Sequence, residues 1–235
     1  MNELVAAGSF GGRAVKINVD EVGIIGGSHC PVPTLFSTDR MYWNIAASLW
    51  GFYYGELARL GSTAIAASQL TGYPPATWKI HGAPVANNFP CVSMMDWRGN
   101  GSDTARTWAL QMTIDILGND EKTIYPAKVR GGGGGAAGAW PLPSTVYSIG
   151  FELGAPAVAA ATVAPGPGPA GKRVVLLANT NTTAVTATVR GAAQGKIHTV
   201  DLDAGYGSVP YSTRTLESEE VKLGPSAFVL IELAK

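Results

Sequence analysis

The sequence predicts an α/β region over residues 1–125 followed by an all-β region over residues 126–235. In the first region, strand patterns alternate with long amphipathic helix patterns, which is typical of a parallel sheet covered by helices. In the second region, short β-rich runs are separated by turn residues and no helical stripe occurs. A pentaglycine run at residues 131–135 and a Pro-Gly stretch at residues 164–169 mark the change, because neither composition supports regular structure.

The first strand is expected over residues 14–25, where apolar alternation passes into a nearly continuous apolar run. A helix is expected over residues 40–60, after the candidate N-cap residues 37–39 and before Gly61. Aromatic residues and alanines recur in it at three- and four-residue spacing. This spacing predicts a wide buried face.

A second strand is expected over residues 62–70, followed by a loop that runs to about residue 100. The next helix is expected over residues 103–117, with Ser102 or Asp103 as its N-cap and Gly118 as its end. Two consecutive strand-helix units predict a parallel sheet with helices on its outside.

The all-β region is expected to form an antiparallel β-sandwich. We expect residues 174–177 and 228–231 to be central strands with alternate residues buried. The β-rich runs lie at residues 145–153, 173–179, 184–189, 196–202 and 227–233.

The charge and hydropathy patterns exclude two classes of partner. Lys plus Arg and Asp plus Glu both total 17 and only 14% of residues are charged, so a nucleic-acid-binding surface is not expected. No segment approaches the roughly 18 uninterrupted apolar residues of a membrane span. Residues 1–20 contain no apolar leader, so a secretion signal would have to lie upstream of Met1.

No metal site or cofactor is expected. Cys30 and Cys91 lack the number and spacing of a zinc site, and whether they pair is left open. His81 and His198 have no partner pattern for a metal. Residues 100–102 and 181–183 fit the N-glycosylation pattern, a short motif that often occurs by chance.

Glu21 is the leading candidate for chemistry, because it lies near the C-terminal end of the first buried strand, where active-site groups of parallel α/β proteins gather. A carboxylate among Val and Ile residues is costly to bury unpaired, so it either reaches a polar cleft or pairs with a cation. An ordinary ion pair explains the pattern equally well. Alternation places Asp20 on the opposite face, which makes it the weaker candidate.

Five segments in order carry a family resemblance: VDEVGIIGGSH, the helix end ELARLG, STAIAASQLTGYP, DTARTWALQMTIDILG and the closing LGPSAFVLIEL. Across nearly the whole chain they resemble retaining glycoside hydrolases of the heparanase and β-glucuronidase type, from the seventh barrel strand onward. The resemblance implies a partial (β/α)8 barrel, of which this chain holds the last two βα units, followed by the β-sandwich. It also implies that Glu21 is the catalytic nucleophile and that Gln69 approaches the sugar.

Three loop residues are candidates for substrate binding under this resemblance. Tyr73 and Trp97 could stack on a sugar ring, although aromatic residues in loops more often serve as ordinary anchors. His29 could line the cleft beside Glu21, or lie on the surface.

The implied mechanism needs two carboxyl groups about 5 to 5.5 Å apart. The family's acid/base Glu follows an Asn at the end of the fourth strand, and the pair Asn2-Glu3 lies outside any expected strand. A (β/α)8 barrel also needs roughly 200 residues or more, so we expect an N-terminal barrel segment or chain as partner, and a carbohydrate substrate. We expect an extracellular or secretory/lysosomal-type compartment.

Two alternatives remain open. One is a non-catalytic carbohydrate-associated or cell-surface structural protein that uses the sandwich as scaffold. The other is a plain β-sandwich adhesion module, which leaves Glu21 and both strand-helix units unexplained. The sequence does not indicate the sugar, the linkage, the oligomeric state, or whether the chain is a fragment or a processed subunit.

Overall fold

The structure is a computed structural model, and it describes nine stretches of the chain. These are residues 17–22, 40–68, 79–80, 83–84, 94–96, 102–118, 122–127, 146–154 and 171–234. Both the α/β part and the β-sandwich part that the sequence predicts are present among them.

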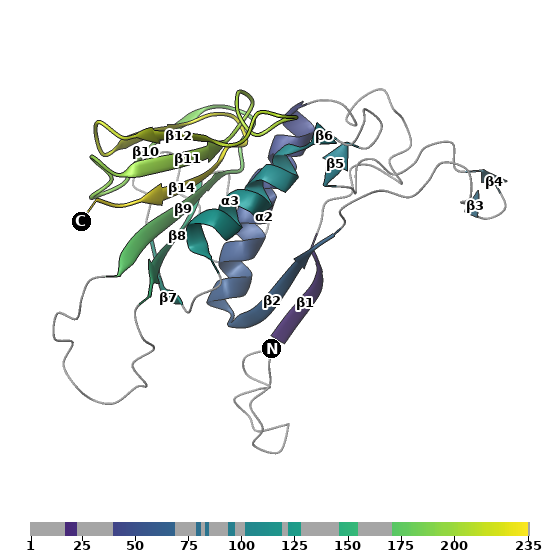
Figure 1. The fold of residues 1–235 in the computed structure, drawn as a ribbon, viewed down its shortest axis with the longest axis horizontal. Coiled ribbons are helices and arrows are strands. Elements are labelled where there is room, and N and C mark those ends of the chain that lie inside the picture. The colour runs from purple at the N-terminus through teal and green to yellow at the C-terminus, as the bar shows by residue number, and fades with distance from the viewer. Residues whose placement is uncertain are drawn as a thin grey trace, which may run out of the picture.

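A six-stranded antiparallel sheet is the largest element of the structure, and its strand order is β12-β11-β14-β9-β8-β7. The strands are β7 (Lys122–Tyr125), β8 (Val146–Leu153), β9 (Lys172–Asn179), β11 (Lys196–Val200), β12 (Ser212–Thr215) and β14 (Phe228–Glu232). The long helix α2 (Arg40–Arg59) and helix α3 (Ala105–Leu117) lie across one face of this sheet, as Figure 1 shows. The other face carries the antiparallel pair β10 (Val185–Thr188) and β13 (Glu220–Leu223).

The two central strands are buried on both faces, and our expectation of alternate burial is wrong for them. Leu176 and Leu230 belong to the core formed with α2 and α3. Their neighbours Leu177 and Val229 belong to the core formed with β10 and β13. Alternation of side chains along a strand still holds, but here both faces of the sheet meet another layer, so residues 174–177 and 228–231 are all buried except Val175, which is partly buried.

The α/β part consists of β1 (Ile17–Val22), α2, β2 (Ser62–Ala67) and α3. β1 and β2 pair in parallel, as the sequence predicts, and they lie on the side of the helices that faces away from the sandwich (Figure 1). Ile65 and Ala67 of β2 pack against the core that the helices share with the sheet. One continuous apolar cluster therefore connects the parallel strands with the sandwich.

The helix ends follow the glycines that the sequence singles out. Gly61 after α2 and Gly118 after α3 have positive φ angles of 76° and 62°, a region that glycine enters at little cost. The N-cap of α3 is Thr104, so our assignment of Ser102 or Asp103 is wrong. Those two residues form the short strand β6 (Ser102–Asp103), which pairs with β5 (Met95–Asp96). This pairing keeps the backbone extended through Asp103, so the N-cap falls at the next residue, Thr104.

Three strands of the sandwich were not anticipated from the sequence. β7, β12 and β13 are each only four residues long, and every residue of β12 is exposed. β13 does alternate, with Val221 and Leu223 buried, but four residues are a short signal. A further short antiparallel pair joins β3 (Lys79–Ile80) and β4 (Ala83–Pro84). The division of the chain into two domains at residue 125 stays a prediction. β7, which ends at that residue, belongs to the sandwich sheet, and α2 and α3 share a hydrophobic core with this sheet.

Within the described parts of the chain, no helix combines the length and apolarity that crossing a membrane requires.

Two glycines inside α2 let the helix approach the sheet closely. A Cβ atom at position 51 would lie 2.5 Å from Cδ2 of Phe228, and one at position 55 would lie 2.5 Å from the hydroxyl oxygen of Tyr147. That hydroxyl donates a hydrogen bond to Glu56 Oε1 at 3.0 Å. The two rings therefore occupy space that any larger helix residue would need.

We predict that Gly51→Ala destabilises the protein although alanine is the better helix former by about 1 kcal/mol. The added methyl group would collide with the Phe228 ring, and overpacking of this kind costs about 1 to 3 kcal/mol. Urea denaturation of the full chain measures the change. In a Phe228→Leu background the same substitution should cost less, and an equal cost in both backgrounds would contradict the collision.

Candidate functional site

The candidate site lies at the C-terminal ends of β1 and β2, where Glu21 is the next-to-last residue of β1. Val19 pairs with Ile65 and Val22 pairs with Ala67, so three steps along β1 match two steps along β2. The irregularity covers Asp20 and Glu21. Extra residues of this kind bend a strand, change the direction of its side chains and often occur beside active sites.

A small hollow lies between these strand ends and the two helices. It has room for about one water molecule, so it cannot accept a sugar ring. It is lined by Val22, Ala46, Trp50, Tyr53, Ala67, Met94 and Arg106. The hollow therefore belongs to the packed residues that support the ends of β1 and β2 from the side of the helices. A substrate cleft would have to lie elsewhere.

Arg106 is the charged residue of this support. It lies in the first turn of α3, its side chain is 6% exposed, and its guanidinium donates a hydrogen bond to the carbonyl oxygen of Ser68. Burial lowers the pKa of Arg106, but a guanidinium stays protonated in proteins. The amide of Ser68 in turn donates to the carbonyl oxygen of Val22 at 3.0 Å, which extends the β1–β2 pairing by one residue.

These bonds restrain the backbone next to two of the predicted site residues. Val22 directly follows Glu21, and Ser68 directly precedes Gln69. Arg106 was missed in the sequence, although it falls on the same helical stripe as Ala109 and Thr113, which are buried. An arginine on the apolar stripe of a helix was the signal that could have found it.

The structure tests few of the predicted site residues. It describes the backbone of Glu21 on β1. Gln69, Tyr73, His29 and Trp97 lie outside the described residues, as do Cys30, Cys91, His81 and the pair Asn2-Glu3. Their roles stay predictions.

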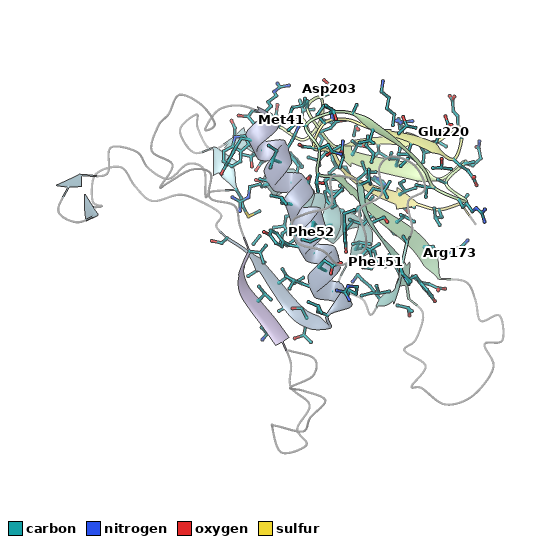
Figure 2. The ribbon with its side chains drawn as sticks, turned by 180° about the vertical axis from the view of Figure 1, so that it is seen from behind. Met41, Phe52, Phe151, Arg173, Asp203 and Glu220 are labelled. Carbon is teal, nitrogen blue, oxygen red and sulfur yellow. The ribbon has the colours of Figure 1, made fainter. Side chains whose placement is uncertain are left out.

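The loop between β11 and β12 joins the sandwich to the N-terminal ends of both helices. Arg40 at the start of α2 donates to the carbonyl oxygen of Leu202 at 3.1 Å and lies 5.3 Å from the ring centre of Tyr206. Trp108 Nε1 of α3 donates to the carbonyl oxygen of Gly207 at 3.1 Å. Met41 and Asp203 accordingly lie at the same end of the molecule (Figure 2). In parallel βα units this is also the end to which the strands point.

His198 has structural partners in the sandwich. Its Nδ1 lies 2.9 Å from Thr213 Oγ1 and its Nε2 lies 2.7 Å from Glu232 Oε1. Lys172 Nζ lies 2.8 Å from the other oxygen of Glu232. Burial raises the pKa of Glu232, but the hydrogen bonds and charges of Lys172 and His198 together bring it below its usual range. In the described part of the chain no three His, Cys, Asp or Glu residues gather as a metal site would require.

A parallel strand pair, two covering helices and an antiparallel sandwich together define an architecture shared with glycoside hydrolases. The catalytic domain of a GH30 xylanase C from Talaromyces cellulolyticus matches with a TM-score of 0.52 and 12% identity, over 95% of this chain and 42% of that one. A β-porphyranase of glycoside hydrolase family 86 from Bacteroides plebeius matches with a TM-score of 0.51 and 11% identity, over 99% of this chain and 37% of that one.

A GH30 endoxylanase from Clostridium papyrosolvens C71 matches with a TM-score of 0.48 and 12% identity, over 99% of this chain and 45% of that one. The chain therefore spans less than half the length of the solved structures it matches. No family model and no curated protein sequence matches it. At these identities the likeness shows the fold alone.

We predict that Arg106→Met lowers the free energy of unfolding by about 1.5 to 3 kcal/mol, the range for a hydrogen bond from a charged group. It should also speed hydrogen exchange at the Ser68 amide, because the end of β2 loses its tie to α3. Arg190→Met, at an exposed turn residue, is the matched control and should change stability by less than about 0.5 kcal/mol. Unchanged exchange at Ser68 in Arg106→Met would contradict the tie.

We predict that Glu232→Gln destabilises the protein at neutral pH and that the difference fades in acid. The lowered folded-state pKa of Glu232 means that its carboxylate contributes fully above its unfolded pKa. The contribution is lost as the pH falls through the folded pKa, below about 4.5. Urea titrations of both proteins near pH 7 and near about pH 3 measure it. A destabilisation of equal size at both pH values would argue against a charged pair.

Proposed function

We propose that this chain is the C-terminal portion of a retaining glycoside hydrolase and that it contributes the nucleophile Glu21. The observation that carries the proposal is the parallel β1–β2 pair, packed against α2 and joined to α3 by Arg106, with Glu21 next to last in β1. The shared fold with glycoside hydrolases supports it independently. The resemblance in sequence favours the heparanase and β-glucuronidase type within this class.

In this proposal, residues 1–125 form the last two βα units of a (β/α)8 barrel and residues 126–235 form the sandwich domain. An N-terminal segment or chain would supply the remaining strands. Two parallel strands leave the outer edge of each strand without a neighbour inside the pair, and a barrel closes such edges. The length of the matched structures, more than twice that of this chain, supports a missing segment.

The chemistry follows from the position of Glu21. In a barrel, residues at the carboxyl ends of the strands border the substrate cleft, and the proposal assigns this role to Glu21. There the Glu21 carboxylate would attack the anomeric carbon and form a glycosyl-enzyme intermediate. The partner segment would supply the proton donor about 5 to 5.5 Å away.

Arg106 would act on this reaction as a positioning residue, because it restrains the backbone beside Glu21 and Gln69. Gln69 would contact the sugar, Tyr73 and Trp97 would stack on it, and His29 would line the cleft. The substrate would be an oligo- or polysaccharide, and the protein would work in an extracellular or secretory-type compartment. No cofactor takes part in this mechanism.

The second candidate is a non-catalytic carbohydrate-associated or cell-surface structural protein that uses the sandwich as a scaffold. The observation that favours it is the sandwich sheet, which is covered on one face by α2 and α3 and on the other by β10 and β13 and so can act as a scaffold. A protein of this kind would need no proton donor and no nucleophile.

We predict that a mechanism-based fluorinated or cyclophellitol-type glycoside labels Glu21 covalently when the chain is combined with its missing segment. Glu21→Gln should abolish labelling and leave the fold intact, because it removes the attacking charge but keeps the shape. Asp20→Asn is the matched control and should still be labelled. Peptide mapping by mass spectrometry reads out the position.

Label on another carboxylate, such as Asp20 or Asp96, would reject the assignment of Glu21. The isolated chain should show no turnover, because general acid catalysis, worth about 10² to 10⁴ in rate, is missing. Robust hydrolysis by the isolated chain would reject the need for a partner segment.

A further inference from the structure

The turn between β9 and β10 presents the segment Asn181-Thr182-Thr183 at the end of the sandwich. Thr182 and Thr183 are exposed, and Asn181 is partly exposed. The segment fits the acceptor pattern for N-glycosylation, in which an Asn is followed two residues later by Ser or Thr, with any residue except Pro between. This short pattern often occurs by chance, so the geometry of the turn must also allow Asn181 to act as the acceptor.

Asn179 holds the turn in one conformation. Its side chain is fully buried, and its Nδ2 donates to the carbonyl oxygens of Thr183 at 2.9 Å and Gly224 at 2.7 Å. Its Oδ1 accepts the amide of Asn181 at 3.0 Å. A buried amide with three hydrogen bonds specifies a backbone conformation strongly, because an unsatisfied group would be costly at this position.

The main chain of Asn181 is engaged on both sides. Its amide bonds to Asn179, and its carbonyl oxygen accepts the amide of Ser226 at 2.8 Å and the hydroxyl of Ser226 at 3.2 Å. Among the described residues, the hydrogen bonds of Asn181 involve these main-chain groups, and the residue is partly exposed. The fold therefore anchors the backbone of the acceptor through its main chain, in a surface turn beside the exposed Thr182 and Thr183.

We propose that Asn181 is an N-glycosylation site, used when the chain passes through a eukaryotic secretory compartment. The donor would be an oligosaccharide carried on a lipid pyrophosphate. The Asn181 Nδ2 forms a bond to the anomeric carbon of the sugar, the bond from that carbon to the pyrophosphate oxygen breaks, and the amide proton is released as the lipid pyrophosphate leaves. The hydroxyl of Thr183 is the recognition group two residues on.

The site is independent of Glu21 and of any glycosidase activity. A glycan is bulky and needs a surface position. The exposed Thr182 and Thr183 and the partly exposed Asn181 meet this condition. We expect the glycan to leave the fold unchanged, because the contacts that organise the turn are made by Asn179 and by the main chain of Asn181.

The test is expression of the full 235-residue chain behind a secretion signal in a eukaryotic host, followed by peptide mapping before and after peptide N-glycosidase treatment. The expected result is a glycan on the peptide that contains Asn181 and conversion of Asn181 to Asp on removal. Asn181→Gln and Thr183→Ala should each abolish the modification at this peptide. Thr182→Ala, in the same exposed turn, is the matched control and should keep it.

Secreted wild-type chain without a glycan at position 181 would overturn the proposal, as would a glycan that survives Thr183→Ala. Circular dichroism and urea denaturation of the enzymatically deglycosylated chain check the fold, and we expect both to match those of Asn181→Gln. Labelling of Glu21 by a mechanism-based glycoside is a separate readout, so failure of the glycosidase proposal would leave this result unaffected.

Discussion

The close approach of α2 to the sandwich sheet is the contact on which the other layers depend. Gly51 admits the ring of Phe228 and Gly55 admits the hydroxyl of Tyr147, so two rings of the sheet enter the surface of the helix. Glycine inside a helix costs about 1 kcal/mol relative to alanine, and the packing of the two aromatic side chains offsets that cost. α3 packs beside α2, and β2, which pairs with β1, packs against the side of α2 that faces away from the sandwich sheet.

Polar groups are placed where this layered core ends. Arg106 lies at the ends of β1 and β2, and Asn179 lies at the turn that leaves the sheet. Glu232, with Lys172 and His198, lies at the end of the last strand. Each is paired, as burial of a polar or charged group requires. The candidate catalytic position and the candidate glycosylation site are both next to such a paired group, because rigid backbone at the margin of a core is what presents a side chain reproducibly.

Much of the secondary structure could be predicted because its signals are local. The helices α2 and α3, the parallel pairing of β1 with β2 and the main sandwich strands follow from periodicity and from glycine at the helix ends. The strand β12 could not be predicted, because STRT carries no apolar alternation and exists through pairing with β11. The N-cap of α3 was misplaced for the same kind of reason, since β5 extends the chain before it by pairing.

The sequence by itself determined the order of the main strands and helices, the helix ends at Gly61 and Gly118, and the position of Glu21 near the end of β1. The burial expected for β1 is not found, because Asn18 is exposed and Val19 and Val22 are only partly buried. Only the tertiary structure decided that both faces of the central strands are covered and that β1 carries an extra residue at Asp20 and Glu21. It alone joined Arg106 to Ser68. The physical reason is that backbone preference and periodicity act over a few residues, whereas burial, strand register and a side chain's partner depend on residues that meet only when the chain is folded.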